Sequence, residues 1–176
     1  MHGPAVAGWL LTALCAATGG YCLLRMRSRV PEQRRSAGGE AFMGFAMAAM
    51  ALPAAWLAPP ATAWRAVAVL FAASAVAGLL RRSAHGAHHA VGSLAMVHMA
   101  LAAAAGAHHG GSPLLTGVLL VYFCGYVVLA GARLVPVPAA VAGPAAAPAG
   151  WGDRPELAAA CRLSMGIGML AMLLTM

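Results

Sequence analysis

Apolar runs long enough to cross a lipid bilayer recur along this whole sequence. A transmembrane helix needs about 20 predominantly apolar residues, and we predict six such spans. Only 9 % of the 176 residues are charged, whereas a soluble domain carries about a quarter, so the charged residues are too few to coat a water-facing surface. The sequence therefore predicts an all-α, polytopic membrane helical bundle in a single domain. The predicted spans cover approximately residues 5–24, 41–57, 62–80, 90–107, 114–132 and 157–175.

The basic residues, all of them arginine, gather at the ends of alternate spans. A group of arginines follows the first span, Arg81 and Arg82 follow the third, and Arg133 follows the fifth. Because arginine and lysine are enriched in cytoplasmic loops, these ends are predicted to face the cytoplasm and both termini to lie outside. We expect a multi-pass protein of the bacterial cytoplasmic membrane, surrounded by lipid. The net charge of +7 is explained by this pattern, and no nucleic-acid partner is expected.

Composition makes the methionines conspicuous. Arginine without lysine, together with abundant Ala, Gly, Pro and Val, is typical of a high-GC genome such as that of an actinobacterium. A high GC content of the genome does not favour methionine, yet the chain has 11 methionines. The segment 135–150 is rich in Pro and Ala and has no helical pattern, so we predict a flexible cytoplasmic linker there.

The densest group of possible ligands lies where the fourth span begins. His85, His88 and His89 fall within five residues, and Met96 follows His89 by one heptad. Positions three, four and seven apart share one face of a helix, so these side chains and Met99 are predicted to lie on one face. A solvated loop that happens to be rich in histidine is the alternative. His98 lies in apolar surroundings and is expected to make a polar contact with another helix.

Three other spans carry sulfur at the same helical spacing. Glu40, Met43, Met47 and Met50 form such a stripe in the second span, with Cys15, Cys22 and Met26 in the first. The sixth span carries Cys161, Met165, Met169, Met172 and Met176. Methionine also packs well in irregular cores, so each stripe can equally be core packing.

Thioether, thiolate and imidazole are soft to borderline donors that suit Cu(I), whereas Mg²⁺ and Ca²⁺ prefer oxygen. The leading hypothesis is therefore a copper-binding membrane protein concerned with homeostasis, delivery or sensing rather than catalysis. Its predicted core ligands are His88, His89 and Met96. Facing positions would supply Met43, Met47 and Met99, and His85 and Glu40 would assist at the cytoplasmic mouth.

Two other classes of function remain open. In the first, the chain is a structural or assembly subunit that packs methionine in its core and joins a membrane partner or a second copy of itself. In the second, the spacing His85-x-x-His88-His89 belongs to an iron-containing redox enzyme of the membrane, similar to the fatty-acid desaturases and hydroxylases. Those enzymes have three such boxes, and this sequence has one. Haem is a related alternative, although only His98 lies well inside a span.

Two motifs together resemble a known family. Met43-x-x-x-Met47-Ala-x-Met50-Ala and His88-His89…Ser93-Leu-Ala-Met96-Val-x-Met99 are similar to stretches in small actinobacterial integral-membrane proteins of unknown function. The resemblance implies a bundle of five or six spans and assigns no activity. It also implies that the Met-rich and His-Met helices are the parts that matter for function.

Overall fold

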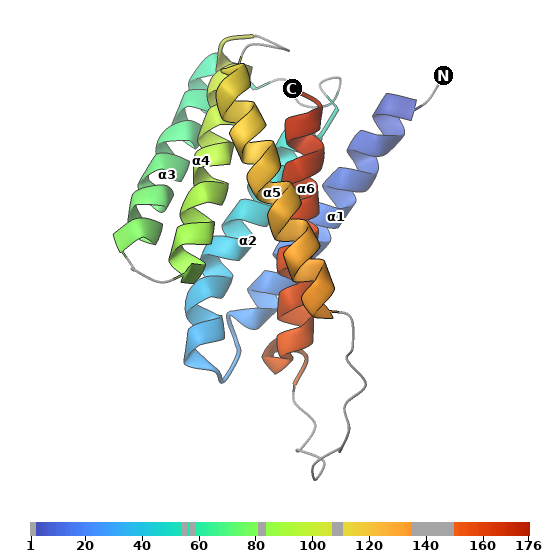
Figure 1. Cartoon of the computed structure of the whole chain (residues 1–176), viewed down its shortest axis with the longest axis vertical. Helices are drawn as coiled ribbons and strands as arrows, with labels where there is room; N and C mark the ends of the chain where they lie inside the picture. Colours follow the sequence, from blue (N-terminus) through green and yellow to red (C-terminus); the bar gives the residue numbers. More distant parts are fainter. Residues whose placement is uncertain (1–2, 54–55, 57–58, 81–83, 107–110, 135–149) are drawn as a thin grey trace.

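A computed structural model describes residues 3–53, 56, 59–80, 84–106, 111–134 and 150–176 of the chain. In these segments the backbone forms six α-helices and one short 3-10 helix, and it forms no strand, which confirms the predicted all-α fold (Figure 1). The predicted linker 135–150 lies outside the described residues except for Gly150. The elements are α1 (Gly3–Arg25), α2 (Pro31–Ala51), α3 (Ala61–Leu80), α4 (Ala84–Ala104), α5 (Pro113–Leu134), η1 (Trp151–Asp153) and α6 (Pro155–Leu174).

Five helices of the described segments are long and apolar enough to cross a membrane. They are α1, α3, α4, α5 and α6, and α2 is the exception because its first half carries Arg34, Arg35 and Glu40. The outward surfaces of α3 and α5 are almost entirely apolar, with exposed residues such as Leu80 and Leu114. Such surfaces suit contact with lipid tails.

Prolines set the ends of α2. Val30 is extended and Pro31 is the first helical residue, a position where the missing N–H of proline is not needed. At the other end, Leu52 has φ −60° and ψ 133°, the conformation that the following Pro53 imposes on its predecessor. The helix therefore begins about ten residues before the predicted span 41–57 and ends at Ala51. The other five helices begin and end close to the predicted spans, except that α4 starts at Ala84 and includes the backbone of His85.

The six helices alternate in direction, so the start of α1 and the end of α6 lie at the same end of the bundle (Figure 1). Each helix packs most closely on a sequence neighbour, in the pairs α1–α2, α3–α4 and α5–α6, and α1 also packs on α6. The ends of α1 and α5, whose last turns carry Arg25 and Arg133, both lie toward the opposite end of the bundle. This placement agrees with the alternating arginine pattern of the sequence.

The core receives side chains from all six helices, including Phe71 of α3, and is unusually rich in sulfur. A single cluster of buried side chains joins these helices, and sulfur-bearing residues make up more than half of it. They are Cys15, Met43, Met47, Met96, Met99, Met169 and Met172. Parts of all four sulfur-bearing faces predicted from spacing therefore meet inside the bundle. Cys22 and Met165 instead belong to a second, smaller cluster, and Met26 is exposed.

His98 makes the polar contact expected of it. The Nε2 atom of this buried α4 side chain lies 2.9 Å from the Thr116 hydroxyl oxygen of α5. The prediction of a helix-to-helix contact is confirmed. Such a contact satisfies an imidazole that would otherwise be unpaired in an apolar environment.

The α1–α2 pair depends on glycine at its closest approach. A Cβ atom at Gly44 would lie 2.9 Å from the Gly19 Cα atom and 3.2 Å from the Cys15 carbonyl oxygen. Both neighbours are backbone atoms, which cannot move without separating the helices. Small residues commonly allow this close packing of membrane helices.

We predict that Gly44→Ala lowers the free energy of unfolding by about 1–3 kcal/mol, the range for overpacking. The matched control is Gly20→Ala in α1, where an added Cβ would meet nothing within 4 Å. The control should be neutral or stabilising, since alanine is favoured over glycine in a helix by up to about 1 kcal/mol. Thermal unfolding in detergent measures both variants, and equal stability of the two would contradict this account of the helix pair.

Candidate functional site

A small cavity lies inside the bundle between α2, α4, α5 and α6. Its volume is about 30 Å³, enough for a water molecule or a single ion, since one probe-sized water needs roughly 10–15 Å³. Two imidazoles, three thioethers, one carboxylate and one guanidinium border it. The lining residues are Glu40, Met43, His88, His89, Gly92, Phe123, Arg162, Met165, Gly166 and Met169.

The α4 helix contributes His88, His89 and Gly92 to this cavity. Gly92 follows the two histidines by four and three residues, so all three share one helix face. The absence of a side chain at Gly92 makes room for α2, because a Cβ atom there would lie 3.3 Å from the Met43 sulfur and 3.9 Å from the Met169 methyl carbon. Thioethers from α2 and α6 therefore reach α4 one turn beyond the imidazoles.

Each imidazole is held by a hydroxyl group of a neighbouring helix. His88 Nδ1 lies 2.9 Å from the Tyr122 hydroxyl of α5, and His89 Nε2 lies 3.0 Å from the Ser74 hydroxyl of α3. The His88 ring also stacks on Tyr126, with ring centroids 3.9 Å apart. These contacts orient both rings, as partners of metal-binding histidines do.

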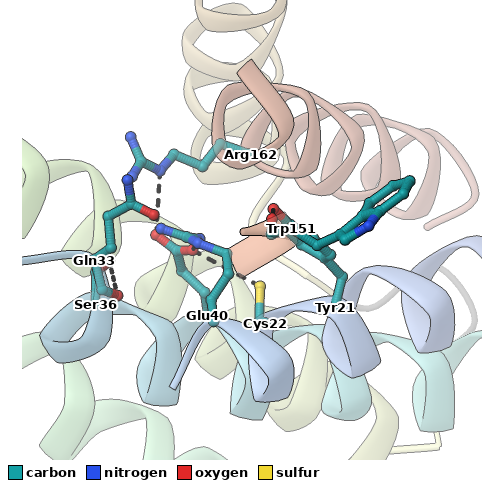
Figure 2. Close-up of polar contacts among 8 residues, drawn as sticks. Tyr21, Cys22, Gln33, Ser36, Glu40, Trp151 and Arg162 are labelled. Carbon is teal, nitrogen blue, oxygen red and sulfur yellow. Dashed lines mark hydrogen bonds and ion pairs between the residues drawn. The ribbon is translucent and has the colours of Figure 1, made fainter. Parts of the chain in front are cut away.

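The Glu40 carboxylate joins three helices at the arginine-rich end of the bundle. Arg25 of α1 donates a hydrogen bond to Glu40 Oε2, and Arg162 of α6 donates to Oε1 at 3.2 Å. Figure 2 shows Arg162 and Cys22 approaching this carboxylate from different helices, with the Cys22 sulfur 3.7 Å from Oε2. Glu40 was predicted to assist at the mouth of a metal site; in the structure it borders the cavity and also binds two guanidinium groups.

This ion cluster carries a net charge of +1, from two arginines and one glutamate. The Arg25 side chain is completely buried, and its Nε and Nη2 atoms have no hydrogen-bond partner among the described residues. Only one side of the guanidinium is therefore paired. Glu40 and Arg162 border the cavity, and Arg25, which does not border it but pairs with Glu40, gives the cluster its net positive charge.

The predicted ligands divide into two groups in the structure. Glu40, Met43, His88 and His89 border the cavity, whereas Met47, Met96 and Met99 lie deeper in the sulfur-rich core. The side chain of His85 lies outside the described residues, as do His108 and His109, and nothing in the structure places them.

Several residues that border the cavity or contact its histidines were not predicted as part of this site. The sequence predicts Met165 and Met169 on a separate stripe in the sixth span, and the fold brings both residues to the same cavity. The sequence alone could have identified Arg162, because an ionisable residue within an apolar span marks a functional or pairing site by default. The hydroxyls of Ser74 and Tyr122 lie on helices without a ligand stripe, so only the packing of those helices identifies them.

The neutral donors that border the cavity are imidazoles and thioethers. In the described part of the chain, no group of three or more His, Cys, Asp or Glu residues is arranged to hold a metal ion. A metal at the cavity would therefore need methionine sulfur beside imidazole. Such a set is soft and electrically neutral.

We predict that Glu40→Ala strongly destabilises the bundle. Removing the carboxylate would leave the buried Arg25 guanidinium without a counter-charge, which typically costs about 3–5 kcal/mol. The control is Glu156→Ala, an exposed acidic residue in the first turn of α6, where the lost helix-dipole interaction is worth about 0.3–1 kcal/mol. Denaturant titration in detergent compares them, and a loss at Glu40 no greater than at Glu156 would show that the ion cluster does not hold the helices together.

Comparison with known proteins gives a family and no activity. No curated protein and no solved structure matches the chain. A family model described as a domain of unknown function, DUF5134, matches residues 32–176. That match covers α2 to α6, including every residue that borders the cavity. The chain therefore belongs to the DUF5134 family.

Proposed function

We propose that this protein binds Cu(I) within the membrane and serves copper homeostasis or delivery rather than catalysis. The observation that carries the proposal is the cavity where His88 and His89 of α4 meet thioethers of α2 and α6. The thioethers are those of Met43, Met165 and Met169.

The donor atoms favour Cu(I) over other biological metals. Thioether sulfur selects soft cations, and imidazole is compatible with Cu(I). Neither a thioether nor a neutral imidazole has to carry a negative charge to bind, so both can act inside a bundle where ionised ligands are costly. The hydroxyl groups of Tyr122 and Ser74 would hold the two imidazoles in a fixed orientation, as such a site needs.

The electrostatics favour a monovalent ion. The charged groups that border the cavity, Glu40 and Arg162, sum to zero, and the Arg25 guanidinium that pairs with Glu40 gives the whole cluster one positive charge. Repulsion is proportional to the charge of the bound ion, so a divalent cation would be opposed twice as strongly as Cu(I). A neutral set of donors beside a positive cluster is therefore better suited to Cu(I) than to Zn²⁺ or Fe²⁺.

We expect detergent-purified protein to contain near-stoichiometric copper when measured by elemental mass spectrometry. The combined variant His88→Ala/His89→Ala/Met43→Leu should lose it, because two imidazoles and one thioether are removed. Met26→Leu is the control, since this exposed methionine lies outside the core clusters. Protein that contains no copper after growth in copper-supplemented medium would refute the proposal, and iron in place of copper would favour the redox alternative.

We also predict that Tyr122→Phe weakens copper binding while leaving the ligands in place. Loss of a group that orients a metal-binding side chain usually costs 10–100-fold in metal affinity, and this change removes only the hydroxyl that is hydrogen-bonded to His88. The matched control is Tyr21→Phe, which removes a hydroxyl that donates to the Trp151 carbonyl oxygen, away from the cavity. Competition with a Cu(I) chelator measures both affinities. Equal affinities for the two variants would show that the contact between Tyr122 and His88 plays no part in copper binding.

A structural or assembly role is the second candidate, and one observation favours it. Met47, Met96 and Met99 lie in the apolar core, where methionine is a common gap-filling side chain. As an assembly subunit, the protein would present lipid-facing helices to a membrane partner or to a second copy. Leucine is a near volume-conserving replacement for methionine; under this alternative, Met43→Leu changes neither stability nor any metal content.

A further inference from the structure

Three helices that run in the same direction carry a regular series of soft donors. The α2, α4 and α6 helices all point toward the end of the bundle that holds the C-terminus (Figure 1). Successive donors on each helix are three, four or seven residues apart, so they recur on one face with every turn or second turn, a turn being about 5.4 Å. They are Met43, Met47 and Met50 in α2, His89, Met96 and Met99 in α4, and Met165, Met169 and Met172 in α6, followed by Met176.

Most of these methionines pack against one another across the three helices; Met165 lies in a second, smaller cluster with Cys22 and Ala41. Six of the methionines belong to a single core cluster, and Met50 and Met176 pack against it. Two glycines, one in α4 and one in α6, leave room for methionine side chains of neighbouring helices. At Gly92, an added Cβ would meet Met43 and Met169; at Gly168, it would lie 2.8 Å from the Met47 methyl carbon and 3.3 Å from the Cys15 sulfur.

The series begins at the cavity and ends near the opposite surface. From His89 to Met99 the distance along α4 is about 15 Å, given a rise of 1.5 Å per residue. At the far end, an added Cβ at Gly111 would lie 2.7 Å from His98 Nε2 and 3.5 Å from the Met176 methyl carbon. An imidazole and a thioether therefore stand together at that end, as they do at the cavity.

The chemistry of this series suits stepwise passage of a soft monovalent cation. Conduction needs several sites in succession, each strong enough to admit the ion and weak enough to release it. Thioethers are neutral donors on flexible side chains, so neighbouring methionines can share an ion and pass it on without proton exchange. The middle of the series is closed to water, since Met47 and Met96 are both 0 % exposed. A dehydrated, sulfur-bound ion could enter such a core, while hydrated Na⁺ or Mg²⁺ could not.

We infer that the sulfur-rich core is a transmembrane path for Cu(I), leading from the cavity at His88 and His89 to the His98–Met176 end. The inference rests on the proposed Cu(I) binding and adds transport to it. It assigns the deeply buried methionines, which do not border the cavity, a part in passing the ion on.

The test uses the full chain in proteoliposomes. Cu(I), kept reduced outside by ascorbate, is supplied to vesicles that hold the chelator bathocuproine disulfonate, and absorbance reports entry. The ladder variant Met47→Leu/Met96→Leu/Met172→Leu removes sulfur from the middle of the path while preserving volume and leaving every cavity residue intact. Met26→Leu is the matched control. Bound copper is measured in parallel on each protein in detergent.

We expect the parent and Met26→Leu to transport Cu(I), and the ladder variant to bind near-stoichiometric copper while its flux falls to that of protein-free vesicles. A parent that binds copper without transporting it would overturn the path and leave the binding proposal intact. Transport by the ladder variant at the parental rate would equally overturn the path. Absence of both copper binding and flux in the parent would refute the binding proposal itself. If the ladder variant does not fold, Met96→Leu and Met172→Leu are measured singly, and parental flux in both would overturn the inference.

Discussion

The structure depends on one carboxylate shared by two arginines. Glu40 of α2 binds Arg25 at the end of α1 and Arg162 near the start of α6, so it ties the N-terminal pair of helices to the C-terminal helix. A charge inside a membrane protein is tolerated only when it is paired or reaches water, and this requirement determines which parts of α1, α2 and α6 can meet. Because Glu40 also borders the cavity, the same contact positions the methionine and histidine faces against one another.

Close packing around this cluster is achieved by small residues. Gly19 and Gly44 let α1 and α2 approach backbone to backbone, and Gly92 and Gly166 admit Met43 and the Tyr126 ring. Membrane helices gain little from apolar burial, because lipid is as apolar as their own side chains, so intimate contact has to provide the stabilisation. In this bundle, glycine supplies the space and methionine fills it. The space at Gly92 lets sulfur lie beside the imidazoles.

The sulfur-rich core joins a packing role with a chemical one. Methionine adapts to irregular gaps between helices, and a soft cation can use the same sulfur atoms as ligands. Packing alone does not require imidazoles oriented by Tyr122 and Ser74 at one end and by Thr116 at the other. Buried thioethers therefore occur together with oriented imidazoles in this core, and this combination links the fold to the proposed handling of Cu(I).

The sequence by itself determined the class of fold, the approximate helices and the face of each helix on which Glu40, Met43, His88 and His89 lie. Only the tertiary structure decided that α6 completes the cavity with Met165 and Met169, that Gly92 rather than Met96 borders it, and that Arg162 pairs with Glu40. The reason is geometric. Residue spacing sets the direction of a side chain about its own helix axis, whereas the rotation and depth of one helix against another depend on contacts between residues far apart in the chain.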